Sequence, residues 1–127
     1  MYPYALTKKI GEDLIIHWSK LYKINITSVR LFNVYGPRAR TSGSYGAVFG
    51  VFMAQLINNK PLTLVGTGNQ KRDFTYVSDI VEIIIKLSRR KDLSGQIFNV
   101  GSGEATSINK IIKLLGGRTF RLFNSTK

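Results

Sequence analysis

The sequence predicts an α/β protein in which short parallel strands alternate with helices. Two patterns indicate this fold class. Apolar residues recur at helical spacing in several segments, and the segments between them are short and rich in β-branched residues. Stretches rich in glycine, asparagine and serine separate the two kinds of segment, as turns require. Because 127 residues with 43% hydrophobic content can bury one modest core, we expect a single globular unit.

The first predicted element is a helix from about Tyr4 to Tyr22. Pro3 fits the first turn of a helix. Four apolar residues then follow one helix face, Ile10, Leu14, Trp18 and Leu21. The next segment, residues 25–32, alternates apolar and polar side chains and carries β-branched residues, which predicts a strand. Gly36-Pro37 ends the regular structure that follows it.

A loop, a helix and a strand are predicted in the middle of the chain. Residues 38–46 are rich in Arg, Ser, Thr and Gly and indicate a long loop, whereas residues 48–58 have helical periodicity. Residues 61–65 predict a short strand, and a turn over residues 66–69 closes it with glycine and asparagine.

In the last third of the chain, predicted helices and strands again alternate. Ser78 is a suitable N-cap for a helix over residues 79–89, which has acidic residues near its positive end and basic residues near its negative end. Residues 97–100 predict a further strand. Ser107 is then expected to cap a final helix that ends before the glycines at 116 and 117.

The formal net charge of +12, from 19 Lys and Arg against 7 Asp and Glu, is the outlying feature of the composition. A charge of this size motivates the hypothesis of a module that binds nucleic acid or another polyanion. The basic residues are dispersed, however, and the cluster Arg89-Arg90-Lys91 lies where a helix C-terminus favours cations. No RRM, KH or zinc signature occurs, so we expect no nucleic-acid partner and leave residues 118–127 as an unassigned basic tail.

Several classes of site are excluded by residues that the sequence lacks. There are no cysteines, so a disulfide framework, a zinc-thiolate site and a cysteine nucleophile cannot form, and we predict no metal site. The apolar runs are far shorter than a bilayer requires, and the N-terminus has no basic-then-apolar leader. We therefore expect a cytoplasmic protein with no membrane partner.

Tyr4 and Lys8 are four residues apart, so a helix presents them on one face. An ammonium beside a phenol favours the phenolate by Coulomb attraction, which suits tyrosine to general acid or base catalysis. The same spacing also occurs in ordinary exposed helix pairs. Both interpretations stay open on these two residues alone.

Four motifs follow one another along the chain: YALTK at residues 4–8, RLFNVYGPR at 30–38, GTGNQKRDFTYVSD at 66–79 and FNVGSG at 98–103. Their order and spacing resemble the extended short-chain dehydrogenase/reductase family of nucleotide-sugar enzymes, particularly the UDP-glucose 4-epimerase-like members and the 4,6-dehydratases. The resemblance covers about residues 2–117. It implies the C-terminal part of a doubly wound Rossmann-type fold with a small substrate-binding α/β portion.

The resemblance also implies an NAD cofactor and a catalytic pair. In this family a tyrosinate takes the proton of the sugar C4 hydroxyl while hydride passes from C4 to NAD, which leaves a 4-keto sugar. Tyr4 matches this base, and Lys8 matches the side chain that holds the nicotinamide ribose. Phe32 lies where the family backbone approaches the nicotinamide. Tyr4, Lys8 and Phe32 are therefore the expected cofactor-binding residues.

Five further positions match the family's nucleotide-sugar site. Asn33 and Arg72 match contacts to the diphosphate, a role that suits a guanidinium because it can give two parallel hydrogen bonds to phosphate oxygens. Thr63 and Val65 fall where the family holds the nucleotide base, with the backbone near Ala47 closing over the same ligand. Without the resemblance, Asn33 is equally a turn former, and for Arg72 the sequence alone favours a surface ion pair with the next residue.

A division of the chain follows from the resemblance as well. Residues 1–35 are expected to belong to an NAD-binding domain and residues 36–117 mainly to the substrate-binding portion, with residues 78–100 returning to the main sheet. No G-x-G-x-x-G fingerprint occurs in the sequence. We therefore expect a C-terminal fragment that by itself neither binds NAD tightly nor turns over.

The expected function is that of a fragment of an NAD-dependent UDP-sugar 4-epimerase. The segments YGPR at residues 35–38 and SYGAV at 44–48 favour the epimerase, and a homodimer is one arrangement that the full-length family allows. The alternatives are a nucleotide-sugar 4,6-dehydratase, a pseudoenzyme that completes a partner, and a non-catalytic basic binding module.

Overall fold

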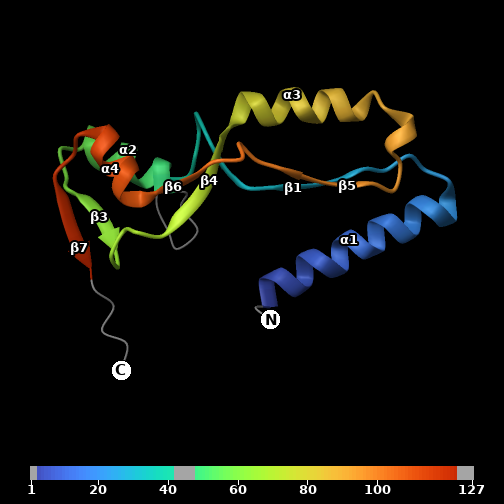
Figure 1. Ribbon diagram of the computed structural model, residues 1–127, viewed down its shortest axis with the longest axis horizontal. Helices are drawn as coiled ribbons and strands as arrows, with labels where there is room; N and C mark the ends of the chain where they lie inside the picture. Colours follow the sequence, from blue (N-terminus) through green and yellow to red (C-terminus); the bar gives the residue numbers. More distant parts are fainter. Residues whose placement is uncertain (1–2, 42–47, 123–127) are drawn as a thin grey trace. The chain divides into compact units, whose positions relative to one another are not determined.

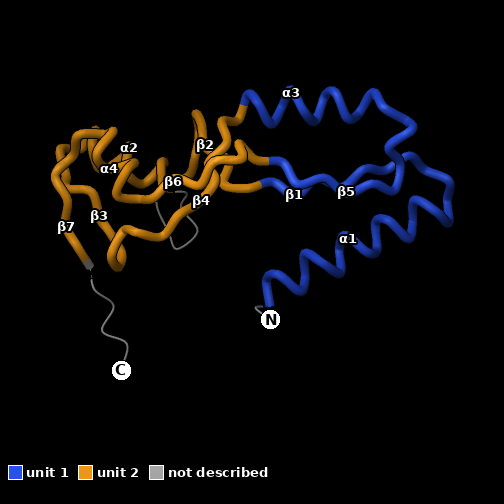
Figure 2. The backbone as a smooth tube through the Cα atoms, viewed as in Figure 1, with its two compact units in different colours: residues 1–31, 78–100 blue, residues 32–77, 101–127 orange. Residues whose placement is uncertain are grey.

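The computed structural model describes residues 3–41 and 48–122 (Figure 1). Helices and parallel strand pairs confirm the predicted α/β class. The chain forms two compact units rather than the one expected from its length (Figure 2), because each unit pairs its own strands. Unit 1 contains residues 1–31 and 78–100, and unit 2 contains residues 32–77 and 101–127.

Unit 1 is built around a parallel pair of strands, β1 (Ser28–Leu31) and β5 (Ile97–Val100). Helix α1 (Pro3–Tyr22) and helix α3 (Val77–Ser88) lie on opposite sides of this pair (Figure 1). A short 3-10 helix, η1 (Lys91–Leu93), leads from α3 to β5.

Polar contacts tie the connection between α1 and β1 to the segment before β5. The hydroxyl of Ser19 donates to Ile24 O at 2.8 Å, and the Ser19 and Ser94 hydroxyl oxygens lie 3.2 Å apart. The backbone N–H of Gly95 donates to Ile26 O at 2.7 Å. Segments that are distant in sequence therefore hold this end of unit 1 together through hydrogen bonds.

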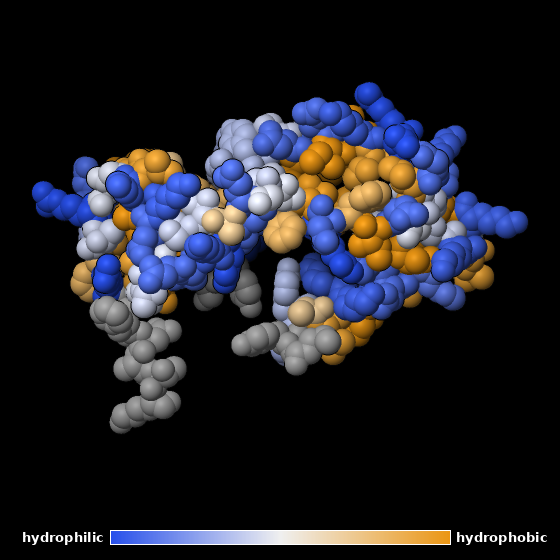
Figure 3. All heavy atoms as spheres, viewed as in Figure 1, coloured by the Kyte–Doolittle hydropathy of each residue, from blue (hydrophilic) through white to orange (hydrophobic). Residues whose placement is uncertain are grey.

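The apolar side chains of α1 are largely exposed. Leu14 and Trp18 are each 51% exposed, and the buried residues of the helix are the polar Glu12 and Ser19. Apolar side chains also gather on the visible surface around α3 (Figure 3), where Val81, Ile84 and Ile85 are exposed. Polar contacts rather than a buried apolar face therefore hold α1 in place within unit 1.

Unit 2 contains two small sheets. In the first, β4 (Lys71–Tyr76) lies between β2 (Asn33–Tyr35), to which it is parallel, and β6 (Ala105–Ser107), to which it is antiparallel. The second sheet is the parallel pair of β3 (Leu62–Val65) and β7 (Thr119–Leu122).

Two helices complete unit 2, α2 (Val48–Ile57) and α4 (Ile108–Leu115). Together with β3 they form the core, which consists of Phe52, Leu62, Leu64, Ile108, Ile111 and Ile112. Because side chains alternate along a strand, β3 turns Leu62 and Leu64 into this core and directs Thr63 and Val65 away from it.

The ends of α4 confirm the predicted capping. The hydroxyl of Ser107 accepts a hydrogen bond from Lys110 N at 3.2 Å, as an N-cap does. Gly116 ends the helix in the left-handed conformation, with φ of 66°, which glycine adopts without steric cost.

The start of α3 and three strands differ from the sequence prediction. The helix begins at Val77, so Ser78 is not its N-cap, and the Ser78 hydroxyl donates instead to Asp79 Oδ1 at 3.2 Å. Strands β4, β6 and β7 were not predicted. Their sequences are short or strongly charged, and pairing with sequence-distant neighbours stabilises them. Strand β7 lies in the stretch that the sequence left unassigned.

Candidate functional site

Tyr4 and Lys8 lie together near the N-terminal end of α1, as helical spacing predicts. The Nζ atom of Lys8 lies 5.5 Å from the centroid of the Tyr4 ring, a cation–π arrangement. Tyr4 is 71% exposed and Lys8 is also exposed. Both side chains are therefore accessible to a ligand.

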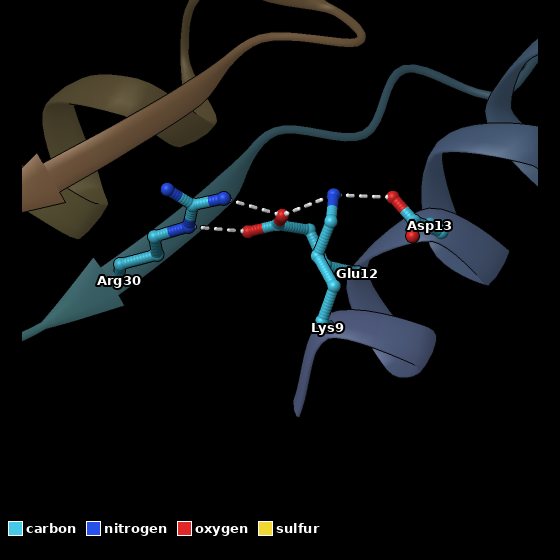
Figure 4. A network of polar contacts seen from close by, with 4 residues as sticks. All are labelled: Lys9, Glu12, Asp13 and Arg30. Atoms are coloured by element: carbon cyan, nitrogen blue, oxygen red, sulfur yellow. Dashed lines mark hydrogen bonds and ion pairs between the residues drawn. The ribbon is translucent and has the colours of Figure 1, made fainter. Parts of the chain in front are cut away.

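A network of charged side chains fixes α1 against β1 (Figure 4). Arg30 of β1 donates from Nε to Glu12 Oε2 at 2.7 Å and from Nη2 to Glu12 Oε1 at 2.6 Å. Lys9 Nζ donates to Glu12 Oε1 at 3.4 Å and to Asp13 Oδ1 at 2.6 Å. The hydrogen bonds from Arg30 lower the pKa of the Glu12 carboxyl to about 2. Because a planar guanidinium defines the direction of both bonds, this network sets how the helix that carries Tyr4 lies against β1.

A hollow of about 830 Å³ opens between α1 and β1. Its lining includes Tyr4 and Lys8 as well as Glu12 and Arg30. The hollow combines a phenol, an ammonium group and an ion pair, and it has room for a ring-sized ligand group beside the phenol.

Unit 2 holds a second concave site, a pocket of about 660 Å³ that we call the β3 pocket. Its polar lining residues are Asn33, Thr63, Gln70 and Arg72, together with Tyr35, which carries a phenol hydroxyl. Arg72 is the one charged side chain among the lining residues that the structure describes. A mostly apolar pocket with a few converging polar groups is typical of a small-molecule site.

Aromatic rings form one wall of the β3 pocket. Tyr35 and Phe49 stack with their centroids 4.4 Å apart, and Phe49 meets Phe74 edge to face at 5.2 Å. Such packing restricts the movement of the rings. The polar groups of the pocket are therefore presented beside a well-packed apolar surface.

Four of the five positions expected around a substrate line this pocket: Asn33, Thr63, Val65 and Arg72. The fifth, Ala47, lies outside the described residues. Of the three expected cofactor positions, Tyr4 and Lys8 belong to unit 1 and Phe32 belongs to unit 2. Phe32 is 49% exposed and follows β1 directly.

Arg72 and Asp73 do not pair with each other, so the surface ion-pair alternative is wrong. Successive residues of a strand point to opposite faces. Asp73 accepts hydrogen bonds from Ser102 N at 2.9 Å, from the Ser102 hydroxyl at 2.8 Å and from Gly103 N at 2.8 Å. The bond from the Ser102 backbone is the largest cause that lowers the pKa of the Asp73 carboxyl.

Asp73 is therefore not an ion-pair partner of Arg72, and the Arg72 guanidinium can contact a ligand in the pocket. Within residues 3–41 and 48–122, its Nη1 donates to Lys71 O at 2.8 Å, and no carboxylate pairs with it. A guanidinium left without a carboxylate partner beside an apolar pocket is suited to an anionic ligand group.

Asn33 is the first residue of β2 and also the central residue of a tight turn, because Val34 N donates to Phe32 O at 3.0 Å, so a turn-forming role remains beside the proposed contact with a ligand. Its Nδ2 donates to Asp73 O at 2.8 Å and links β2 to β4. The amide oxygen of Asn33 remains an acceptor, and the second amide hydrogen remains a donor. Asn33 thus has polar groups to spare at the pocket.

Two glutamines at this site were missed by the sequence reasoning. Gln70 lines the pocket and donates from Nε2 to Val65 O at 3.1 Å. Gln55 of α2 bonds twice to Thr63, through Nε2 to Thr63 Oγ1 at 2.7 Å and through Oε1 to Thr63 N at 3.1 Å. A glutamine in the otherwise apolar helix VFGVFMAQLI was the available signal for Gln55.

Neither a metal cluster nor a membrane span is found in the part of the chain that the structure describes. No group of three or more His, Asp and Glu side chains there is arranged to bind a metal ion. No helix there has the length and apolar character needed to cross a bilayer.

Comparison with known proteins matches the chain to one family. The model of the NAD dependent epimerase/dehydratase family matches residues 1–101. An uncharacterized UDP-glucose epimerase of Bacillus subtilis is 38% identical over 128 residues, a match that covers 98% of this chain and 39% of the relative.

Solved structures agree with this assignment. A UDP-N-acetylglucosamine 4-epimerase from Methanobrevibacter ruminantium, in complex with UDP-N-acetylmuramic acid, matches with a TM-score of 0.86 at 28% identity, over 95% of this chain and 40% of that one. A UDP-glucuronic acid 4-epimerase from Bacillus cereus, in complex with UDP-glucuronic acid and NAD, matches with a TM-score of 0.77 at 35% identity, over 95% of this chain and 39% of that one. The chain thus spans about two fifths of the length of these relatives. With the family model matched over residues 1–101, this chain belongs to the NAD-dependent epimerase/dehydratase family.

Proposed function

We propose that this chain supplies the nucleotide-sugar pocket and the tyrosine–lysine pair of an NAD-dependent UDP-sugar 4-epimerase. The observation that carries the proposal is the Arg72 guanidinium, which lines the β3 pocket without a carboxylate partner among the described residues. The names of similar proteins support it, since those reported above are UDP-sugar epimerases.

In this proposal the pocket contacts two groups of the ligand, the anionic diphosphate and the aromatic base. Arg72 donates parallel hydrogen bonds to the diphosphate, and the free amide groups of Asn33 add to them. The base lies along β3 at Thr63 and Val65, and Ala47, which lies outside the described residues, is proposed as a further contact. The 660 Å³ volume of the pocket is of the size that small-molecule sites have.

Chemistry in this proposal begins at Tyr4. The phenolate of Tyr4 takes the proton of the sugar C4 hydroxyl and returns it at the end of the cycle. The ammonium of Lys8 stabilises the phenolate and donates hydrogen bonds to ribose hydroxyls of the cofactor. The backbone at Phe32 lies near the nicotinamide in this proposal. When bound, NAD would supply the reversible hydride transfer at the sugar C4 that epimerisation requires. The exposure of Tyr4 and Lys8 beside a hollow of about 830 Å³ supports these roles.

The 127 residues alone are proposed to be inactive and to bind NAD weakly, because their sequence contains no G-x-G-x-x-G fingerprint. A cytoplasmic location and a homodimer belong to the same proposal and rest on the family alone. Isothermal titration of the chain with NAD tests the cofactor part. Weak or undetectable heat is expected, and stoichiometric tight binding would contradict it.

The substrate part is tested by titrating the chain with UDP-glucose. Arg72→Ala is expected to weaken binding by about 10- to 100-fold, the range for losing charge-assisted hydrogen bonds. Arg89→Ala is the matched control, because it removes the same charge from the C-terminal side of α3 in unit 1. Equal losses in both variants would indicate unspecific charge attraction and contradict the proposal, as would a wild-type chain that does not bind UDP-glucose.

A further inference from the structure

We propose that Gln55 holds the Thr63 hydroxyl as a hydrogen-bond donor to a carbonyl oxygen of the ligand's base. The β3 pocket is then selective for nucleotides whose base carries such a carbonyl at this position, as uracil does. Gln55 is a positioning residue in this arrangement, and Thr63 is the specificity-determining residue. The inference rests on the proposed function, because it assumes that a nucleotide occupies the β3 pocket.

Gln55 and Thr63 are joined by two hydrogen bonds. The Nε2 atom of Gln55 donates to Thr63 Oγ1 at 2.7 Å, and the backbone N–H of Thr63 donates to Gln55 Oε1 at 3.1 Å. Both residues are half-buried. Two bonds between one side chain and one residue fix the amide plane relative to β3.

The orientation of the amide follows from the chemistry of its partners. A backbone N–H can only donate, so the oxygen of Gln55 must face it, and the NH₂ group must then face the Thr63 hydroxyl. Because an NH₂ group of an amide can only donate, the hydroxyl must accept from it. The hydroxyl proton of Thr63 is therefore not used in this pair.

The unused proton is available at the pocket. Thr63 lines the β3 pocket together with its strand neighbours Leu64 and Val65. Within the described residues, no protein atom accepts a hydrogen bond from Thr63 Oγ1. A half-buried hydroxyl without an acceptor favours a ligand that provides one.

A carbonyl oxygen is the acceptor that distinguishes the bases. Uracil carries two carbonyl oxygens, whereas adenine carries none. A site built to donate a hydrogen bond discriminates against a ligand that leaves the donor unpaired, because the half-buried group then loses its hydrogen bond to water without replacement. UDP and ADP, which share the diphosphate, therefore provide a direct comparison.

Two substitutions at Thr63 test the donor itself. Thr63→Val removes the hydroxyl at nearly constant volume and is expected to weaken UDP binding about tenfold, whereas Thr63→Ser keeps the hydroxyl and should bind like wild type. ADP should bind more weakly than UDP and with the same affinity to wild type and Thr63→Val. A similar loss for both nucleotides would show a change of pocket shape and would overturn the inference.

A substitution at Gln55 tests the orientation. In Gln55→Glu both carboxylate oxygens only accept, so the Thr63 hydroxyl would turn its proton towards Glu and away from the ligand. UDP binding should fall about tenfold in the wild-type background and much less in the Thr63→Val background. An equal loss in both backgrounds would assign the effect to the added negative charge and overturn the inference.

The titration also separates this inference from the proposed function. If wild type does not bind UDP, both fail. If UDP binding depends on Arg72 but is unchanged in Thr63→Val, the proposed function stands and only the inference about Thr63 is wrong. Circular dichroism melting of each variant identifies loss of folding, and Thr63→Ser provides the folded comparison that keeps the hydroxyl.

Discussion

Arg30 donates two parallel hydrogen bonds to Glu12, at 2.7 and 2.6 Å, and so joins β1 to α1. Glu12 is buried, whereas most of the apolar side chains on the same helix are exposed. The position of α1 in unit 1 therefore depends strongly on this one pair. Since α1 also carries Tyr4 and Lys8, the pair sets where these two side chains lie relative to β1.

Glu12→Gln is expected to lower the Tm of the chain clearly, because it leaves Arg30 with a neutral amide in place of a carboxylate. Glu82→Gln is the matched control. Glu82 pairs with Lys86 four residues along on the exposed surface of α3, where such pairs contribute little. Thermal melting followed by circular dichroism compares the two, and an equal change in Tm would mean that the pair of the buried Glu12 with Arg30 is no stronger than the surface pair.

The same pair predicts a pH dependence. The pKa of Glu12 is lowered from its ordinary value of 4.5 to about 2, so its contribution to stability is fully present above about pH 4.5 and is lost as the pH falls towards 2. Urea unfolding at several pH values between 5 and 2 measures the slope of the free energy of unfolding against pH. The slope should become shallower in Glu12→Gln, and an unchanged slope would show that Glu12 does not titrate as described.

The core of unit 2 predicts a large effect at Leu62. This side chain is 0% exposed and packs in the cluster with Phe52 and Ile111, so Leu62→Ala should cost about 2–5 kcal/mol in the free energy of unfolding. Leu114→Ala, on α4 in the same unit, removes a side chain that is 76% exposed and should cost less than about 1 kcal/mol. Urea unfolding measures the loss of free energy of unfolding in both variants, and similar losses for Leu62→Ala and Leu114→Ala would be evidence against the described core.

Replacing either of two glycines by alanine should change the stability of the chain, in opposite directions for the two positions. A Cβ at Gly101 would lie 2.6 Å from Phe32 Cδ2 and 2.7 Å from Asp73 Oδ2, so Gly101→Ala should destabilise the chain. At Gly11, inside α1, a Cβ meets nothing within 4 Å, so Gly11→Ala should stabilise by about 0.5–1 kcal/mol. Thermal melting of both variants measures whether each substitution raises or lowers the Tm. A higher Tm for Gly101→Ala would contradict the close approach of Phe32 and Asp73 to Gly101.

Asp73→Asn is expected to loosen the turn at Ser102 and Gly103. The carboxylate accepts from both backbone N–H groups, and an amide offers only one acceptor oxygen in its place. Hydrogen exchange at these two amides should become faster, while Asp92→Asn, on η1 in unit 1, should leave them unchanged. Unaltered exchange at Ser102 would show that Asp73 does not hold the turn.

Much of the fold could be predicted from local pattern. The helix over residues 4–22 and the capping by Ser107 follow from periodicity and side-chain chemistry, and the structure confirms both. Strand β7 could not be predicted, because it forms by pairing with β3 more than fifty residues away. Ser78 gave a wrong helix start, since α3 already begins at Val77, one residue before it and directly after β4.

The candidate site was predicted better by motif than by single residues. The motif order pointed to Asn33, Thr63, Val65 and Arg72, and the structure brings these four to one pocket. Taken singly, Arg72 suggested a surface ion pair, because the sequence cannot show that Asp73 bonds instead to a turn thirty residues away. Gln55 was missed for the same reason, since its partner Thr63 lies on another element.

The most direct test of the central claim is an NMR titration of the isotopically labelled 127-residue chain with UDP-glucose. The account predicts saturable shifts of backbone amides that border the β3 pocket, Asn33, Thr63, Val65, Gln70 and Arg72, with loss of these shifts in Arg72→Ala. Shifts confined to exposed basic segments such as residues 89–91, or no shifts at millimolar ligand, would contradict it.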